Sequence, residues 1–373
     1  LGDSWKKFMG LPVDDALKPR VAEYGAEDAR LDLRRHYARV NIPIVHVGGW
    51  YDIDAAYTLE DFAGLQNRGG DGAKGNQRLI MGAFGHQGAP QGLKYPDTAG
   101  KSDMGAALAV RWFDHWLKGA DNGVTAEPRV RYFIMGDTKD RDAPGNEWRA
   151  ADSWPPPSGP TPWHLHPDGS LDCDKPPNET SHRSWVYDPK APVPTIGGNN
   201  NSPDNVGPLD QRSVSNRPDV LRFVSHPLDH PVEVAGPLKA DLWVSTDAED
   251  TDFIVKLVDI YPDGYEALVQ DQGFRLRHHE GLYTQARVEA GRIYPIQIDL
   301  WSTALIFNAG HRIALFVQSS NAPRFEPHSN RWNPVASYED SVCATNSLYF
   351  GPKYPSRVVL PVIGIEANQS SAS

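Results

Sequence analysis

Hydrophobic and polar positions divide the chain into two regions of different texture. Up to about residue 120, short apolar runs alternate with stretches whose apolar residues recur at helical spacing. From about residue 128, short strand-like runs follow one another with Pro, Gly, Asp and Asn between them. The first pattern predicts alternating strands and helices, and the second is typical of an all-β sandwich or jelly roll.

The first region contains a predicted β-α-β unit. Residues 42–47 form a short β-branched run closed by glycines, which suits a buried parallel strand. Residues 59–65 place three apolar side chains at helical spacing, and residues 78–81 form a second short strand. Two strands separated by a helix make a β-α-β unit with parallel strands, and we expect its crossover to be right-handed.

A further helix is predicted to begin after Ser102 or Asp103 and to end at Gly119. Its apolar residues share one face, so we expect this face to pack on a larger body; they are Ala109, Trp112, Phe113, Trp116 and Leu117. In the second region, residues 188–210 are rich in Pro, Gly and Asn and predict a long surface loop.

Composition narrows the classes of partner. The chain has 373 residues and a net charge of −11, from 37 basic and 48 acidic residues, and it contains no Lys/Arg-rich block. This argues against nucleic acid and anionic membranes as partners. No apolar run approaches the roughly 18 residues that span a bilayer. Cys173 and Cys343 are compatible with one disulfide or with two thiols, so they do not identify the compartment. A homo-oligomer is a separate possibility that the sequence leaves open.

Two residues that could carry acid–base chemistry follow the two predicted strands. Asp52 comes directly after Gly48-Gly49-Trp50-Tyr51, and His86 follows the second strand 34 positions later. Parallel strands lie about 4.8 Å apart, so side chains at their carboxyl ends can meet. A carboxylate that orients an imidazole makes its second nitrogen a base, and acid before histidine is the chain order of α/β-hydrolases. The alternative is an Asp that caps a turn and a His in a loop.

A second acidic group, at residues 247–252, lacks the spacing of an EF-hand. We therefore predict charges at a turn and a strand edge there rather than a calcium site. No other part of the sequence indicates a ligand set, and we expect neither a metal nor a cofactor.

The Asp52 and His86 segments resemble those of the cocaine-esterase-like (CocE/NonD) serine hydrolases, which include α-amino-acid ester hydrolases, acylases and X-Pro dipeptidyl peptidases. The similarity extends over nearly the whole chain. Further segments that are similar to the family are Trp112 to Gly119, Val130 to Gly136, Trp148-Arg149 before Trp154-Pro155, Tyr187 to Pro189, Gly207 to Arg212, Asp250 to Phe253, Tyr261 to Gly264 and Gly310 to Arg312.

The resemblance implies that Asp52 is the triad acid and His86 the triad base. Phe84 stands where the family usually has tryptophan, which alters packing more than chemistry. Asp54 matches a position that faces the acyl pocket and can bind a substrate ammonium, the alternative being a solvent-facing Asp at a helix N-terminus. Trp50 and Tyr51 would either line the cleft or pack under the β-domain.

The resemblance also implies a nucleophile that these residues do not contain. The Gly-x-Ser-x-Gly elbow does not occur in the 373 residues. We therefore expect residues 1–40 to be the end of a helical cap and the return to the sheet, residues 41–125 the C-terminal part of an α/β-hydrolase domain, and residues 126–373 a jelly-roll sandwich. On this interpretation the chain is incomplete and inactive alone.

The implied reaction is hydrolysis of an ester or amide, with a small molecule or short peptide as substrate, through an acyl-enzyme. The competing hypothesis is a non-catalytic jelly-roll module that binds carbohydrate or protein.

Overall fold

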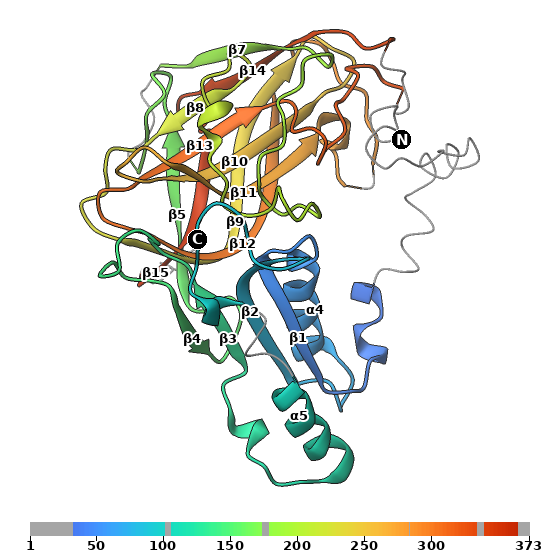
Figure 1. Ribbon diagram of the computed structural model, residues 1–373. Coiled ribbons are helices and arrows are strands. Elements are labelled where there is room, and N and C mark those ends of the chain that lie inside the picture. Colours follow the sequence, from blue (N-terminus) through green and yellow to red (C-terminus); the bar gives the residue numbers. More distant parts are fainter. Residues whose placement is uncertain (1–32, 101–105, 174–178, 283, 334–338, 365–373) are drawn as a thin grey trace, which may run out of the picture.

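The computed structural model describes residues 33–100, 106–173, 179–282, 284–333 and 339–364 (Figure 1). A small mixed sheet with two α-helices forms one end of the molecule, and a large two-layered β structure forms the other. The expected helix start at Ser102 or Asp103 and most of the expected cap segment lie outside the described residues. No helix in the described part of the chain has the length and apolar character needed to cross a bilayer.

The small sheet contains the predicted β-α-β unit. Strand β1 (Ile44–Tyr51) leads into helix α4 (Ala55–Arg68), which leads into strand β2 (Gln77–Gly85). The two strands are parallel, with Ile44 opposite Gln77 and Tyr51 opposite Gly85. Both carboxyl ends therefore lie at the same edge of the sheet.

Helix α4 is fixed to the sheet by its apolar face. Leu59, Phe62 and Leu65 are buried, as their spacing predicts. Two short 3-10 helices precede β1, η2 (Leu33–Arg35) and η3 (Tyr37–Arg39). The Tyr37 ring packs so closely on Gly64 of α4 that a Cβ there would overlap it. The start of the described chain is thereby fixed to the outer side of α4.

The sheet is wider than the sequence indicated. Strand β3 (Val130–Ile134) pairs parallel with β2, and β4 (Glu147–Ala151) pairs antiparallel with β3, giving the order β1-β2-β3-β4. These two strands follow residue 126, where we expected the sandwich to begin, but they pair with the small sheet. The alternation of Val130, Tyr132 and their neighbours predicts a strand. Periodicity does not tell which other strand it will pair with.

Helix α5 (Ala106–Lys118) is present, but its apolar face is mostly uncovered. Trp112 is buried, whereas Phe113 is 55% and Leu117 is 77% exposed. The expectation that this face packs on a larger body is thus wrong within the described residues. Figure 1 shows α5 at the end of the molecule farthest from the sandwich.

The second region forms two packed antiparallel sheets, as predicted, and contains no α-helix in its described residues. One sheet has the order β11-β10-β13-β8, and the other has the order β6-β5-β15-β9-β14-β7 with β12 paired to β9. The strands of the first sheet are β8 (Leu221–Val224), β10 (Asp252–Ile260), β11 (Glu266–Arg275) and β13 (Arg312–Gln318). Those of the second are β5 (Ser158–Leu165), β6 (Leu171–Asp172), β7 (Ser181–Tyr187), β9 (Val232–Thr246), β12 (Tyr294–Phe307), β14 (Ala344–Phe350) and β15 (Arg357–Ile363).

The four-stranded sheet of the sandwich, β11-β10-β13-β8, is buried on both faces. All nine residues of β10 are buried. One face contributes Val255 to the main core, and the other contributes Val258, which packs with Val193 and Val214 of the segment after β7. Residues 188–210 therefore form the long loop that was predicted, but much of it covers the sheet instead of lying at the surface. Within this loop, Val193 and the partly buried Ile196 provide the apolar contacts with that face of the sheet.

The two parts of the molecule share one hydrophobic core. Trp50 of β1 contacts Trp154 with a ring-centroid distance of 5.3 Å and donates its indole N–H to the Phe133 carbonyl at 2.7 Å. Met135 after β3 exchanges backbone hydrogen bonds of 3.0 and 2.9 Å with Ala304 and Ile306 of β12. The small sheet is thus held rigidly against the sandwich.

A buried ionic cluster also joins the two parts. His311 lies between two carboxylates, with Nδ1 at 2.9 Å from Asp259 of β10 and Nε2 at 3.2 Å from Asp137, which follows β3. Its ring contacts Tyr261 at a centroid distance of 4.3 Å. Burial alone would lower the pKa of His311, but the hydrogen bonds and charges of Asp259 and Asp137 outweigh burial and raise it above the ordinary value.

The acidic residues at 247–252 are used for structure, as predicted. Asp250 is fully buried and lies 3.1 Å from His328 while also pairing with Arg277. Asp252 pairs with Arg275 at 2.8 Å. Cys173 and Cys343 are both exposed, and no disulfide joins them.

Candidate active site

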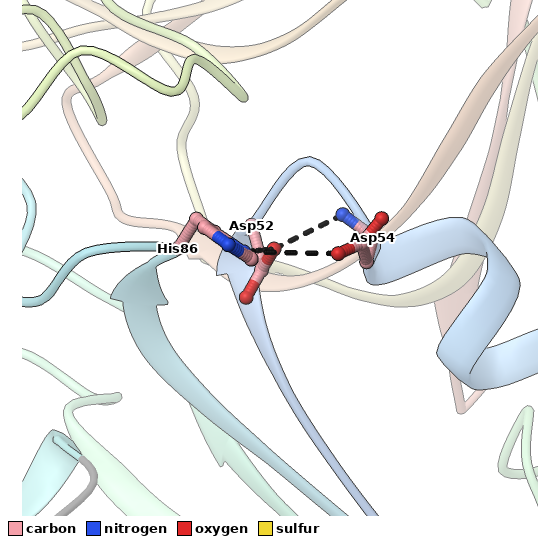
Figure 2. Close-up of side chains that lie close together, drawn as sticks. All are labelled: Asp52, Asp54 and His86. Carbon is pink, nitrogen blue, oxygen red and sulfur yellow. Dashed lines mark hydrogen bonds and ion pairs between the residues drawn. The ribbon is translucent and has the colours of Figure 1, made fainter.

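The ends of β1 and β2 bring Asp52 and His86 together. Asp52 follows Tyr51, His86 follows Gly85, and Tyr51 and Gly85 are partners in the parallel ladder. His86 Nδ1 lies 3.0 Å from Asp52 Oδ1, so the predicted hydrogen bond between these side chains is confirmed (Figure 2). The Asp52 residue is 8% exposed, whereas the His86 side chain is 43% exposed. A buried carboxylate thus holds an imidazole that solvent can reach.

Glycines allow the two strand ends to converge. A Cβ on Gly49 would overlap the carbonyl oxygen of Phe84, and one on Gly82 would lie 2.8 Å from the Phe84 ring. The ladder changes register between Gly49 and Tyr51, because Trp50 of β1 lies opposite two residues of β2, Ala83 and Phe84. The Asp52 amide then donates to the Gly49 carbonyl at 3.0 Å, closing a turn that directs the carboxylate toward His86.

Asp54 lies beside this pair at the N-terminus of α4. It is the N-cap residue, although its side chain makes no capping hydrogen bond. Its backbone N–H donates to Asp52 Oδ1 at 3.0 Å, and its Oδ2 lies 3.7 Å from His86 Nδ1 (Figure 2). The side chain is 62% exposed. Asp54 is therefore both a solvent-facing residue at a helix start and a neighbour of His86.

Trp50 and Tyr51 lie beneath the site. They are 0% and 1% exposed. The Tyr51 hydroxyl faces the Leu268 carbonyl at 3.5 Å, and burial raises the pKa of Tyr51 well above its usual range. Of the two alternatives expected for these residues, the structure shows packing under the sandwich. Neither side chain lines a surface that a substrate could reach in this conformation.

The donor atoms of Asp52, Asp54 and His86 lie within 4.8 Å of one another, a separation that could accommodate a divalent cation. The 3.0 Å contact between His86 Nδ1 and Asp52 Oδ1 is, however, the distance of a hydrogen bond. A metal ion between these atoms would have to replace that bond. The arrangement therefore fits an acid–base pair better than a metal site.

Two polar side chains of the sandwich support the Asp52 turn. Asn199 donates from Nδ2 to the carbonyl oxygens of Trp50 and Asp52, both at 2.9 Å. Gln270 of β11 donates to the Trp50 carbonyl at 3.2 Å. Neither residue was expected at the site from the sequence. Asn199 belongs to a run of Gly and Asn that predicts only a loop, and no local signal connects either residue with Asp52.

The chain is similar to known proteins over most of its length. Residues 122–359 match the X-Pro dipeptidyl-peptidase C-terminal non-catalytic domain. The chain is 34% identical to the cocaine esterase of Rhodococcus sp. (strain MB1 Bresler) over 342 residues, which are 86% of this chain and 56% of that protein. It spans about half the length of the curated relatives that it matches.

Two solved structures have the same fold. An α-amino acid ester hydrolase superposes with a TM-score of 0.79 at 27% identity, over 91% of this chain and 59% of the other. An aminopeptidase from the marine sediment archaeon Thaumarchaeota archaeon superposes with a TM-score of 0.80 at 24% identity, over 91% and 58%.

Asp52 and His86 precede the matched domain, and most of the sandwich that supports them lies within it. The domain match covers more than half of the sequence, and the similarity to the relatives extends across both parts. The chain therefore belongs to the family that carries the X-Pro dipeptidyl-peptidase C-terminal domain and, among these proteins, to the CocE/NonD group.

Proposed function

We propose that Asp52 and His86 are the acid and base of a serine hydrolase that cleaves carboxylic esters or amides. The observation that carries this proposal is the 3.0 Å contact between a buried carboxylate and an accessible imidazole at the carboxyl edge of parallel strands. The relatives give it support, because one is named a cocaine esterase and another an α-amino acid ester hydrolase.

In this mechanism Asp52 orients His86 through Nδ1, and Nε2 is the nitrogen that takes the proton of the nucleophile. The serine oxygen attacks the carbonyl carbon, and His86 returns the proton to the leaving alcohol or amine. Water then attacks the acyl-enzyme, with His86 again accepting a proton, and releases the acid. Asp52 stays ionised and stabilises the imidazolium in both steps.

We place the nucleophile and the oxyanion donors outside these 373 residues, because the sequence has no Gly-x-Ser-x-Gly elbow. On this proposal β1, α4 and β2 are the C-terminal part of an α/β-hydrolase sheet, and the sandwich is of the jelly-roll kind. The 373-residue chain alone would be inert, since the loss of a triad serine in a comparable enzyme costs about a million-fold in turnover.

The position of Asp54 extends the proposal to substrate preference. Its carboxylate lies 3.7 Å from His86 Nδ1 and is exposed, so it could pair with a cationic amine on the acyl side of a substrate. We propose that the enzyme favours esters or amides of acids that carry an amino group.

The decisive experiment is an assay of the full-length gene product with p-nitrophenyl esters. His86→Ala should lower kcat by about a million-fold, as loss of a triad histidine does elsewhere. His230→Ala replaces an exposed histidine in a turn and should retain activity. Equal activity of the two variants would refute the assignment of His86. Adding the upstream segment in trans to residues 1–373 should restore a turnover that depends on His86.

A second candidate function is binding without catalysis, and one groove of the sandwich favours it. Trp243 on β9 contacts Tyr354 at a centroid distance of 5.4 Å, while Asp241 accepts from Gln297 at 2.8 Å and from Arg357 at 3.0 Å. The groove is lined by Asp241, Leu242, Trp243, Pro295, Ile296, Gln297, Pro355 and Arg357. An aromatic side chain with polar neighbours is a surface on which a sugar ring could stack. Saturable quenching of tryptophan fluorescence by an oligosaccharide, abolished in Trp243→Ala, would support this function.

A further inference from the structure

We propose that residues 197–207 of the sandwich, here called the clamp loop, position both Asp52 and His86 for catalysis. This inference rests on the proposed function. It assigns a role in the reaction to a segment of the domain described as non-catalytic. The clamp loop contacts the turn after β1 and the turn after β2. Its two ends are bonded to each other, and the residues next to them are held by the sandwich.

The contact with the acid is made by Asn199. Its side chain is 2% exposed, and its amide donates to the Trp50 and Asp52 carbonyls at 2.9 Å each. Each carbonyl has one further donor at 3.2 Å, Gln270 for Trp50 and the Ala55 amide for Asp52, so Asn199 is the group that ties both carbonyls to the loop. Asn199 therefore fixes the backbone of the residue whose side chain orients His86.

The contact with the base is made two residues later. Gln87, which follows His86, donates from Nε2 to the backbone carbonyl and to Oδ1 of Asn201, both at 3.1 Å. Val206 accepts from the Gln91 amide at 2.8 Å, and its side chain would lie 2.6 Å from a Cβ on Gly85. The residues on both sides of His86 are thus packed against the clamp loop.

The clamp loop is itself held firmly. Gly198 and Gly207 exchange backbone hydrogen bonds of 2.8 and 3.0 Å, which close its neck. Inside the loop, Asn205 accepts from the Gly197 amide at 2.7 Å. Below it, buried Gln211 donates to the Ile196 carbonyl at 2.9 Å. The loop can therefore transmit the position of the sandwich to the two triad residues.

Positioning at this level has a large effect on rate. A displacement of about 1 Å at a reacting group can cost about 100-fold in turnover. Asn199 acts through the Trp50 and Asp52 carbonyls and Asn201 acts through Gln87, so both are positioning residues. Their loss should lower kcat and change KM little, because substrate binding does not depend on the alignment of the acid with the base.

The principal variant is Asn199→Leu in the full-length protein, which has a similar shape but no donor. We expect kcat on a p-nitrophenyl ester to fall about 10- to 100-fold, with KM within about three-fold of the wild-type value. Asn67→Leu is the control, since it removes the same kind of amide from an exposed position on α4, where Asn67 donates to the Ala63 carbonyl at 2.8 Å, and it should keep wild-type kcat. Equal losses in the two variants, accompanied by equal falls in melting temperature, would overturn the proposal.

A spectroscopic readout separates the clamp from the hydrolase proposal. The proton between His86 Nδ1 and Asp52 should give a low-field resonance in a protein labelled with 15N-histidine. This signal should weaken or shift in Asn199→Leu and stay unchanged in Asn67→Leu. The change in resonance would support the clamp even if the wild-type protein had no esterase activity, and an active wild type with an unchanged resonance and kcat in Asn199→Leu would refute the clamp alone.

Should Asn199→Leu fail to fold, Gln87→Met tests the other contact from an exposed position. It removes both hydrogen bonds to Asn201 and should lower kcat several-fold with KM nearly constant. A kcat identical to wild type in Gln87→Met would show that the clamp loop does not position His86.

Discussion

Gly49 and Phe84 approach each other so closely at the ends of β1 and β2 that a Cβ on Gly49 would overlap the Phe84 carbonyl oxygen. The obstacle is backbone, which cannot move aside as a flexible side chain could. The approach lies at the register shift that directly precedes Asp52 and His86, which are in hydrogen-bond contact. The geometry of the candidate acid–base pair therefore depends on the absence of a side chain at position 49.

Gly49→Ala should accordingly destabilise the protein and disrupt the site. Overpacking of this kind typically costs about 1–3 kcal/mol, so the urea midpoint should fall, and ester hydrolysis by the full-length protein should be lost. Gly100→Ala is the control: its φ of −91° suits alanine, and the nearest atom to a new Cβ is 3.5 Å away. A Gly49→Ala protein with a normal midpoint and normal turnover would contradict this account.

The sequence predicted the Asp52–His86 contact because each residue follows an apolar run, and parallel strands end at a common edge. It did not predict where β3 pairs. Val130–Ile134 has the same alternation whether it joins the small sheet or the sandwich, and only tertiary packing decides. The apolar face of α5 shows the same limit, because Phe113 and Leu117 indicate amphipathicity but not what covers them.

The support from Asn199 was unpredictable for a different reason. Its partners are the backbone carbonyls of Trp50 and Asp52, almost 150 positions away in the chain, and a backbone acceptor imposes no pattern on the sequence around it. The position of the clamp loop follows from the packing of residues such as Val193 on the four-stranded sheet, which no local pattern encodes.

Asp52→Asn should leave the fold intact and greatly reduce turnover. The amide keeps the size of the carboxylate, but it presents a neutral group to His86 Nδ1 and favours the wrong tautomer. In a comparable triad the same change lowers kcat by about 10⁴-fold. We would measure kcat of the full-length protein together with its melting temperature. Asp97→Asn, at an exposed position in η4 (Asp97–Ala99), is the control and should retain wild-type values for both.

Asp54→Asn should change substrate discrimination modestly. The side chain is 62% exposed, so an ion pair with a substrate ammonium is worth at most about 1 kcal/mol, or roughly five-fold in kcat/KM. We would compare an α-amino acid ester with the matching ester that lacks the amino group. The preference for the first should fall two- to five-fold in the variant and in high salt. An unchanged ratio would remove Asp54 from the acyl site.

Chelation provides a test of the metal alternative at Asp52, Asp54 and His86. If these residues act as an acid–base group, dialysis of the full-length protein against EDTA should leave ester hydrolysis unchanged. Added Zn²⁺ should inhibit it, because the metal would compete for the imidazole and the carboxylates. Loss of activity on chelation, with recovery on adding one divalent metal, would instead favour a metal site.

The pH dependence of stability should report on His311. Because the carboxylates of Asp259 and Asp137 raise its pKa, the folded protein retains a proton that the unfolded chain releases above its ordinary pKa of about 6.5. The stabilisation is complete below that pH and is lost as the pH rises through the raised pKa. Burial raises the pKa of Asp259 as well, which acts in the same direction.

The urea midpoint of the wild type should therefore fall between pH 6 and pH 8. Each unit by which the folded pKa of His311 exceeds the unfolded one corresponds to about 1.4 kcal/mol. The range ends at pH 8 because burial lowers the pKa of Lys256 to about 8, and the resulting gain of stability at higher pH would oppose the effect.

Asp137→Asn keeps an acceptor for the Lys139 amide, which Asp137 Oδ1 binds at 2.6 Å, and removes one of the two charges that face His311. Its midpoint should vary less with pH over the same range, since the pKa of His311 then returns toward its ordinary value. A variant whose pH dependence equals that of the wild type would show that the His311 cluster does not carry the effect.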